Sequence, residues 1–147
     1  MSETGNSEPN PDFVGVISSV VALVRDTDGQ VLLASLSESG PWSCLGGGVF
    51  GGESLAAAAV RLTREDCGLS VEVSHVVAEL SGEKYRVLYE CGADLRYLST
   101  VYDAKLLDDG DPEPTPLHTT KWFASTELAG FSLYEFATAA LADLVLL

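Results

Sequence analysis

The chain has 147 residues, 46% of them hydrophobic, and its 22 acidic and 8 basic residues give a formal net charge of −14. This length predicts one domain with its own core, without a disulfide framework. The acidic excess would repel nucleic acid polymers and anionic membranes, which we therefore exclude as partners. A small phosphorylated ligand stays compatible, because a divalent cation bridges phosphate to carboxylate.

Residues 1–12 are polar and acidic and predict a disordered tail, followed by a single domain at 13–147. The start lacks the basic and apolar parts of a signal peptide, and no apolar run reaches the roughly 20 residues that span a bilayer. The three cysteines are odd in number and lack metal-ligand spacing. We therefore expect a cytoplasmic protein with reduced thiols.

The N-terminal half predicts two strands and a helix. Residues 14–26 are rich in β-branched side chains, Asp28-Gly29 is a hairpin signal, and residues 31–37 follow as the return strand. Residues 54–67 contain no Gly or Pro and are rich in alanine, which predicts a helix that ends before Gly68.

The C-terminal half predicts further strands and a last helix. The expected strands are 69–80, 84–93, 95–107 and 119–124, and an acidic, proline-containing loop at 108–116 separates the last two. Ser125 is a candidate helix cap, and residues 132–147 have an apolar helical face. Because strands cluster rather than alternate with helices, the fold class is α/β (α+β), a mixed sheet sandwiched by helices.

The segment 45–52 is unusually rich in glycine and leads into the first helix. A Walker phosphate loop is excluded because Gly52 is followed by Glu53 instead of lysine, and Glu53 would also repel a dinucleotide pyrophosphate at the helix start. The remaining interpretation is a divalent cation held by carboxylates, with backbone carbonyl groups of the loop as further ligands. Glu65 and Asp66, the adjacent acids at the end of the helix, are either such carboxylates or a solvated helix end. Acidic residues oppose the dipole at the end of a helix unless a cation is present.

Seven residues of this segment have the spacing of a known signature: Gly47, Glu53, Arg61, Glu65, Asp66, Gly68 and Leu69. The pattern resembles the Nudix hydrolase family, and the sequence KWFASTEL at 121–128 is similar to a Trp-Phe segment of that family. The resemblance implies an α/β/α sandwich around a mixed β-sheet.

Site roles are carried over from this resemblance. It implies that Glu65 and Asp66 face a metal ion, that the Gly46 carbonyl is a backbone ligand, and that Glu53 and Arg61 form an ion pair bracing loop against helix. The implied cofactor is Mg²⁺ or Mn²⁺, and the implied partner is a small nucleotide-like phosphorylated substrate. The resemblance also implies a homodimer as a candidate assembly.

The chain departs from the family pattern at several positions. Leu62 stands where the family has a glutamate, one helical turn before Glu65 and Asp66 and on their face of the helix. Phe50 occupies a loop position where many members carry glutamate. Many members of the family also supply an acidic base from the loop before the Trp-Phe segment. Here the nearest positions are residues 116–119, which include His118 but no acid, and the acids farther back are Asp108, Asp109, Asp111 and Glu113.

Two functions remain open on these residues. The first is a Nudix-type hydrolase that cleaves the pyrophosphate of a nucleoside diphosphate derivative, with activity reduced or altered by Leu62. The alternative is a catalytically inactive Nudix-fold domain that binds a nucleotide or regulates a partner. A purely structural protein explains neither the glycine loop nor the spacing of the signature.

Overall fold

The computed structural model describes residues 11–107 and 119–144. Residues 1–10 of the predicted tail and the whole predicted loop 108–116 lie outside the described residues. The boundary of the domain at residue 13 therefore stays a prediction. No helix in the described part of the chain is long and apolar enough to cross a membrane.

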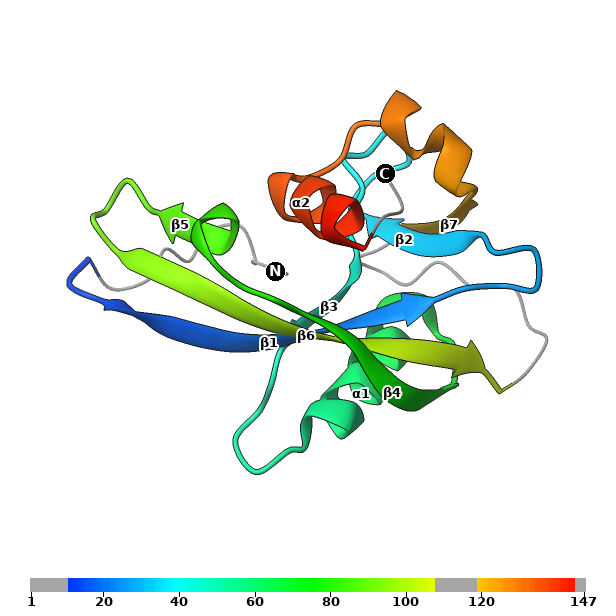
Figure 1. Cartoon of the computed structure of the whole chain (residues 1–147), viewed down its shortest axis with the longest axis horizontal. Coiled ribbons are helices and arrows are strands. Elements are labelled where there is room, and N and C mark those ends of the chain that lie inside the picture. The colour runs from blue at the N-terminus through cyan, green and yellow to red at the C-terminus, as the bar shows by residue number, and fades with distance from the viewer. Residues whose placement is uncertain (1–10, 108–118, 145–147) are drawn as a thin grey trace.

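A mixed five-stranded sheet forms the centre of the molecule (Figure 1). Its strand order is β3-β1-β6-β4, and β5 pairs with the first residues of β6, ahead of the part that pairs with β4. β1 runs parallel to β6, and the remaining pairs are antiparallel. The strands are β1 (Val14–Val24), β3 (Leu45–Gly48), β4 (Val71–Leu80), β5 (Arg86–Leu88) and β6 (Asp94–Leu106).

The two faces of this sheet are covered by different helices. Alternate residues of β1 enter two separate cores, with Val20 and Val24 on one face and Val21 and Leu23 on the other. Helix α1 (Leu55–Cys67) packs on the first face, and α2 (Glu135–Asp143) contributes Ala140 and Leu141 to the core on the second. Figure 1 shows α1 below and α2 above the sheet, so the predicted α/β/α sandwich is confirmed.

The predicted hairpin between the first two strands is present only next to the turn, where Arg25 and Val31 form an isolated antiparallel bridge. The turn forms, because the Asp26 carboxylate accepts hydrogen bonds from the backbone N–H groups of Asp28 and Gln30. However, β2 (Val31–Ser35) pairs with β7 (Thr119–Phe123) in a separate two-stranded sheet. β3 takes the edge of β1 that a return strand would use.

At two further predicted elements, the structure has a 3-10 helix that the sequence did not predict. The predicted strand 84–93 begins as a 3-10 helix, η1 (Glu83–Tyr85), and only β5 of it is extended. The predicted C-terminal helix is preceded by a second 3-10 helix, η2 (Ser125–Gly130), which is capped at Ala124 rather than at Ser125. Glu127 Oε1 accepts the Ala124 N–H at 2.8 Å.

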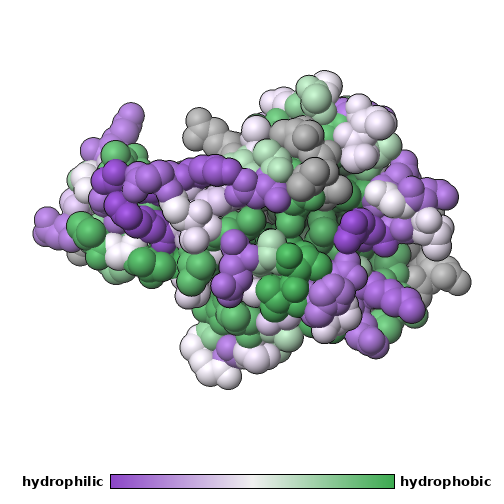
Figure 2. Space-filling view, viewed as in Figure 1, coloured by the Kyte–Doolittle hydropathy of each residue, from purple (hydrophilic) through white to green (hydrophobic). Residues whose placement is uncertain are grey.

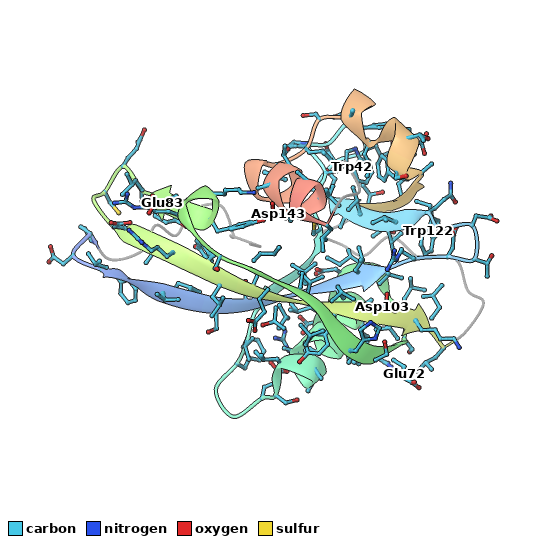
Figure 3. The ribbon with its side chains drawn as sticks, viewed as in Figure 1. Trp42, Glu72, Glu83, Asp103, Trp122 and Asp143 are labelled. Carbon is cyan, nitrogen blue, oxygen red and sulfur yellow. The ribbon has the colours of Figure 1, made fainter. Side chains whose placement is uncertain are left out.

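Helix α2 is tied to η1 by polar contacts at its last residue. Tyr85 is buried, and its hydroxyl donates to the Asp143 carboxylate at 2.7 Å, which also pairs with Lys84. Figure 3 shows Asp143 at the end of α2, facing this part of the chain. The helix dipole disfavours the negative charge of Asp143 at the C-terminal end of α2, and the contacts with Lys84 and Tyr85 compensate for this cost.

Polar side chains cover the upper side of the strands that project beyond α2, and hydrophobic ones gather along their lower edge (Figure 2). Val14 and Val16 of β1 are 75% and 63% exposed there, because α1 packs farther along the same face. The core under α1 therefore does not extend to the start of β1, whereas the core on the other face includes Tyr85 and Leu95 near that end of the sheet.

Close packing explains part of the glycine cluster. A Cβ atom on Gly46 would lie 2.2 Å from the Val20 carbonyl oxygen, so only glycine lets β3 approach β1 in this way. A Cβ atom on Gly47 would lie 3.3 Å from Leu62 Cδ2 on α1. These two glycines set the spacing of β3 from its neighbours.

We predict that Gly46→Ala lowers the free energy of unfolding by about 3 kcal/mol, because the methyl group meets backbone that cannot move aside. Gly48→Ala is the matched control, since a Cβ atom there meets nothing within 4 Å, and its effect should stay within about 0.5 kcal/mol. Urea denaturation of both variants measures the difference. Equal stabilities would contradict the close approach of β3 to β1.

Candidate cation-binding site

Helix α1 begins and ends as the sequence predicts. The Ser54 hydroxyl accepts the Ala57 N–H at 3.1 Å at the start, and Gly68 adopts the left-handed conformation at the end, where its N–H donates to the Arg64 carbonyl. With both ends fixed, Arg61 and Glu65 lie one turn apart on the same side of the helix.

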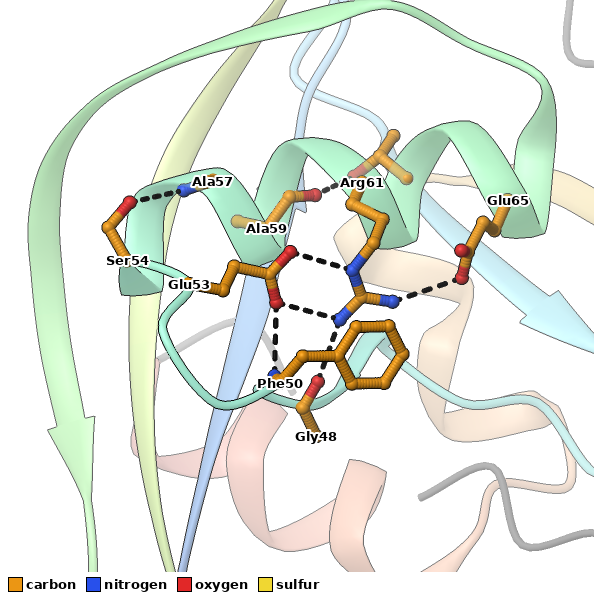
Figure 4. Close-up of polar contacts among 9 residues, drawn as sticks. Gly48, Phe50, Glu53, Ser54, Ala57, Ala59, Arg61 and Glu65 are labelled. Atoms are coloured by element: carbon orange, nitrogen blue, oxygen red, sulfur yellow. Dashed lines mark hydrogen bonds and ion pairs between the residues drawn. The ribbon is translucent and has the colours of Figure 1, made fainter.

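The Arg61 guanidinium connects the glycine-rich loop to α1 (Figure 4). Its Nε donates to Glu53 Oε2 at 2.8 Å and its Nη2 to Glu53 Oε1 at 3.1 Å, which makes a two-pronged ion pair. Nη2 also donates to the Gly48 carbonyl at 3.0 Å, and Nη1 donates to Glu65 Oε1 at 3.1 Å. The ion pair expected between Glu53 and Arg61 is therefore present, and it extends to Glu65.

The loop itself turns back so that Glu53 reaches Arg61. The Glu53 N–H donates to the Phe50 carbonyl at 3.1 Å, and Gly52 between them has φ of 83°. A turn with positive φ at its third residue favours glycine there. The Phe50 N–H in turn donates to Glu53 Oε1 at 3.1 Å, so the loop holds the carboxylate from the backbone side.

The ring of Phe50 lies over the guanidinium of Arg61, with the Arg61 Cζ atom 3.8 Å from the ring centroid. No sequence pattern signals this contact, because the two residues are separated by part of the loop and almost two turns of helix. It is a cation–π contact on a residue that is 62% exposed.

These contacts favour the ionised form of the Glu53 carboxyl. The Arg61 hydrogen bonds and then the Phe50 N–H lower the pKa of Glu53 below its ordinary value. The same pair raises the pKa of Arg61. Loop and helix are therefore joined by two groups that keep their charges throughout the neutral range.

Glu65 and Asp66 lie in the last turn of α1. The Glu65 side chain is 54% exposed, and Asp66 is half-buried. Leu62, one turn earlier, is only 8% exposed and packs in the core between α1 and the sheet, beside Gly47. The position where the family has a third carboxylate is therefore filled by an apolar side chain of the core.

Glu65 and Asp66 supply two carboxylates at the end of α1. Among residues 11–107 and 119–144, no group of three or more His, Cys, Asp or Glu side chains is placed to hold a metal ion. Two adjacent carboxylates still offer the oxygen donors that Mg²⁺ and Mn²⁺ prefer, and Mg²⁺ normally keeps several waters beside one or two carboxylates. The predicted backbone ligand Gly46 lies in β3, which packs against α1.

Two other groups bear on this site. Burial raises the pKa of the Cys67 thiol to about 12, and the neighbouring Asp66 charge adds to the effect, so Cys67 is neither a thiolate ligand nor a nucleophile. The candidate downstream bases, Asp108, Asp109, Asp111, Glu113 and His118, lie outside the described residues.

We predict that Glu53→Gln lowers the melting temperature at pH 7 by a few degrees, because Arg61 loses its charged partner. Since the pKa of Glu53 is lowered in the folded state, its stabilising contribution is full above the unfolded pKa of about 4.3 and is lost as the pH falls through the folded pKa. The melting temperatures of wild type and variant should therefore converge as the pH falls below the lowered folded pKa of Glu53.

Glu72→Gln is the matched control, because Glu72 is an exposed acid on β4, outside the site. It should melt like the wild type across the pH range. A Glu53→Gln deficit that persists unchanged into acid would contradict the role of the Glu53 charge.

Known proteins share this architecture. A model of the NUDIX domain matches residues 16–144, whereas no curated protein sequence matches the chain. A MutT protein from Methanosarcina mazei Go1 superimposes with a TM-score of 0.67 at 22% identity, covering 93% of this chain and 97% of that one. An ADP-ribose pyrophosphatase from Streptococcus suis 89-1591 gives 0.64 at 24% identity, over 88% and 87%. A UDP-X diphosphatase gives 0.68 at 18%, over 92% and 60%. At these identities the structures show a shared fold, and with the domain match over most of its length the chain belongs to the NUDIX family.

Proposed function

We propose that this chain is a divalent-cation-dependent hydrolase that cleaves the pyrophosphate linkage of a nucleoside diphosphate derivative, with reduced activity. One observation carries the proposal: Arg61, fixed by Glu53 and Gly48, directs Glu65 beside Asp66 at the end of α1. The names of two structural neighbours, an ADP-ribose pyrophosphatase and a UDP-X diphosphatase, support this substrate class.

In this proposal Glu65, Asp66 and the Gly46 carbonyl would hold Mg²⁺ or Mn²⁺. When bound, the cation supplies charge neutralisation for the phosphate oxygens and acidifies a water molecule. Glu53 and Arg61 do not need to touch the substrate, because their contacts fix the loop and the Glu65 carboxylate. The net charge of −14 would otherwise repel a phosphorylated substrate from the carboxylates.

Leu62 supports the proposal of reduced activity. Its side chain is buried in the core, so neither a third metal ligand nor a general base is available at that position. The same observation favours the second candidate, a domain that binds a nucleotide derivative without cleaving it. The cytoplasmic location, the homodimer and the small nucleotide-like partner belong to the proposal with either function.

A substrate panel tests the proposal directly. The purified protein, with Mg²⁺ or Mn²⁺, should release a nucleoside monophosphate from at least one member of a panel of nucleoside diphosphate derivatives. Asp66→Asn should lower this turnover by at least about tenfold, because one of the two carboxylates that would hold the cation is lost. Glu79→Gln, an exposed acid on β4, is the control and should keep full turnover.

Binding without turnover across the panel would replace hydrolysis by the nucleotide-binding function. If the protein neither binds nor hydrolyses any member of the panel, both functions are contradicted. Full turnover in Asp66→Asn would remove Asp66 from the site.

We predict that Leu62→Glu has two opposite effects. The folded protein loses stability, by about 2 kcal/mol or more, because a carboxylate replaces a side chain that is only 8% exposed. Turnover per folded molecule rises at least about tenfold, because a positioned base contributes roughly 10² to 10⁴ in rate. Metal-dependent turnover and the melting temperature are measured on the same preparation.

Leu62→Gln is the control with the same shape and no charge. It should lose stability without gaining turnover. If Leu62→Glu is folded under the assay conditions and its turnover equals that of Leu62→Gln, a missing carboxylate at this position does not explain the reduced activity.

A further inference from the structure

The Phe50 side chain is highly exposed, whereas its backbone N–H and carbonyl groups both form hydrogen bonds. Its ring is 62% exposed, so burial of apolar surface accounts for little of its presence in the loop. Its backbone N–H donates to Glu53 Oε1, and its backbone carbonyl accepts from the Glu53 N–H. The ring is therefore carried on a turn that is already tied to the partner of Arg61.

The guanidinium of Arg61 has its edges and one face occupied by different groups. Glu53, Gly48 and Glu65 accept hydrogen bonds from its N–H groups, and such bonds lie close to the guanidinium plane. The Phe50 ring lies 3.8 Å from Arg61 Cζ and contacts the group from a face. The carboxylates hold the guanidinium by its edges, and the ring limits its tilting about them.

The chemistry of the ring matters as much as its position. A carboxylate at position 50 would compete with Glu53 and Glu65 for Arg61 and add negative charge to a chain that already carries −14. An aromatic face attracts the guanidinium without accepting its hydrogen bonds. Phe50 can therefore hold Arg61 and leave all its donors for Glu53, Gly48 and Glu65.

We propose that Phe50 is a positioning residue that acts through Arg61 on Glu65. The ring restrains the guanidinium, the guanidinium orients the Glu65 carboxylate, and the carboxylate is presented to a cation in one direction. The first two steps follow from the contacts of Arg61 with Phe50 and Glu65, and the last step rests on the proposed function. Phe50 itself contacts neither the cation nor the substrate.

The experiment compares Phe50→Ala, Phe50→Trp and Leu88→Ala in the full chain. Phe50→Ala removes the ring, whereas Phe50→Trp keeps an aromatic face that binds guanidinium at least as well. Leu88→Ala removes an equally exposed side chain, 64% against 62%, on β5 away from α1. The first readout is solvent exchange of the Arg61 Nε–H by nuclear magnetic resonance, without metal, and the second is the affinity for Mn²⁺ by electron paramagnetic resonance.

We expect Phe50→Ala to speed exchange of the Arg61 Nε–H and to weaken Mn²⁺ binding, each by about two- to fivefold. The melting temperature should change little, Phe50→Trp should restore both values, and Leu88→Ala should match the wild type. Unchanged exchange in Phe50→Ala, or a change that Leu88→Ala shares, would overturn the proposal. So would faster exchange with unaltered Mn²⁺ affinity, because Glu65 would then not depend on the ring.

The two proposals fail in different ways. If the wild type shows neither Mn²⁺ binding nor turnover, the proposed function fails, together with the last step from Glu65 to the cation. The exchange rate of Arg61 would still show whether Phe50 restrains the guanidinium.

Discussion

The two-pronged ion pair between Arg61 and Glu53 is the interaction on which the candidate site depends. It joins a glycine-rich loop, which has little side-chain packing of its own, to a helix whose ends are capped. The same guanidinium contacts Gly48 and Glu65, so loop backbone, helix and exposed carboxylate share one cation. Loss of that charge would release all three at once.

The scaffold brings the loop and helix close enough for this contact by using very small residues. Ala58 and Ala59 of α1 are fully buried against the sheet, and Gly46 lets β3 approach β1 at a distance that no side chain permits. Glycine in a loop costs conformational entropy on folding. For Gly46 and Gly47 that cost is offset by the close packing of β3 against β1 and α1, so these two glycines are required by the fold itself.

The sequence predicted those helices and strands whose signals lie within their own residues. Helix α1 was predictable from its alanine content and from Gly68, and the β-branched residues of 14–26 predicted a strand there. The pairing of β2 was not predictable, because β3, which lies later in the sequence, pairs with the edge of β1 next to which β2 would continue a hairpin. In the site, signature spacing predicted the pair of Glu53 and Arg61, whereas the Phe50 ring on Arg61 depends on the three-dimensional course of the loop.

We propose that the end of α1, facing the loop that Arg61 fixes, holds a divalent cation. Paramagnetic broadening by Mn²⁺ in the wild-type protein can locate this ion, because it maps a bound paramagnetic metal without requiring a substrate. We expect substoichiometric Mn²⁺ to broaden first the backbone amide signals of Glu65, Asp66 and the β3 residue Gly46, while β5 and α2, which lie away from the end of α1, keep sharp signals. Broadening centred on the acidic surface elsewhere, or spread evenly over the chain, would contradict it.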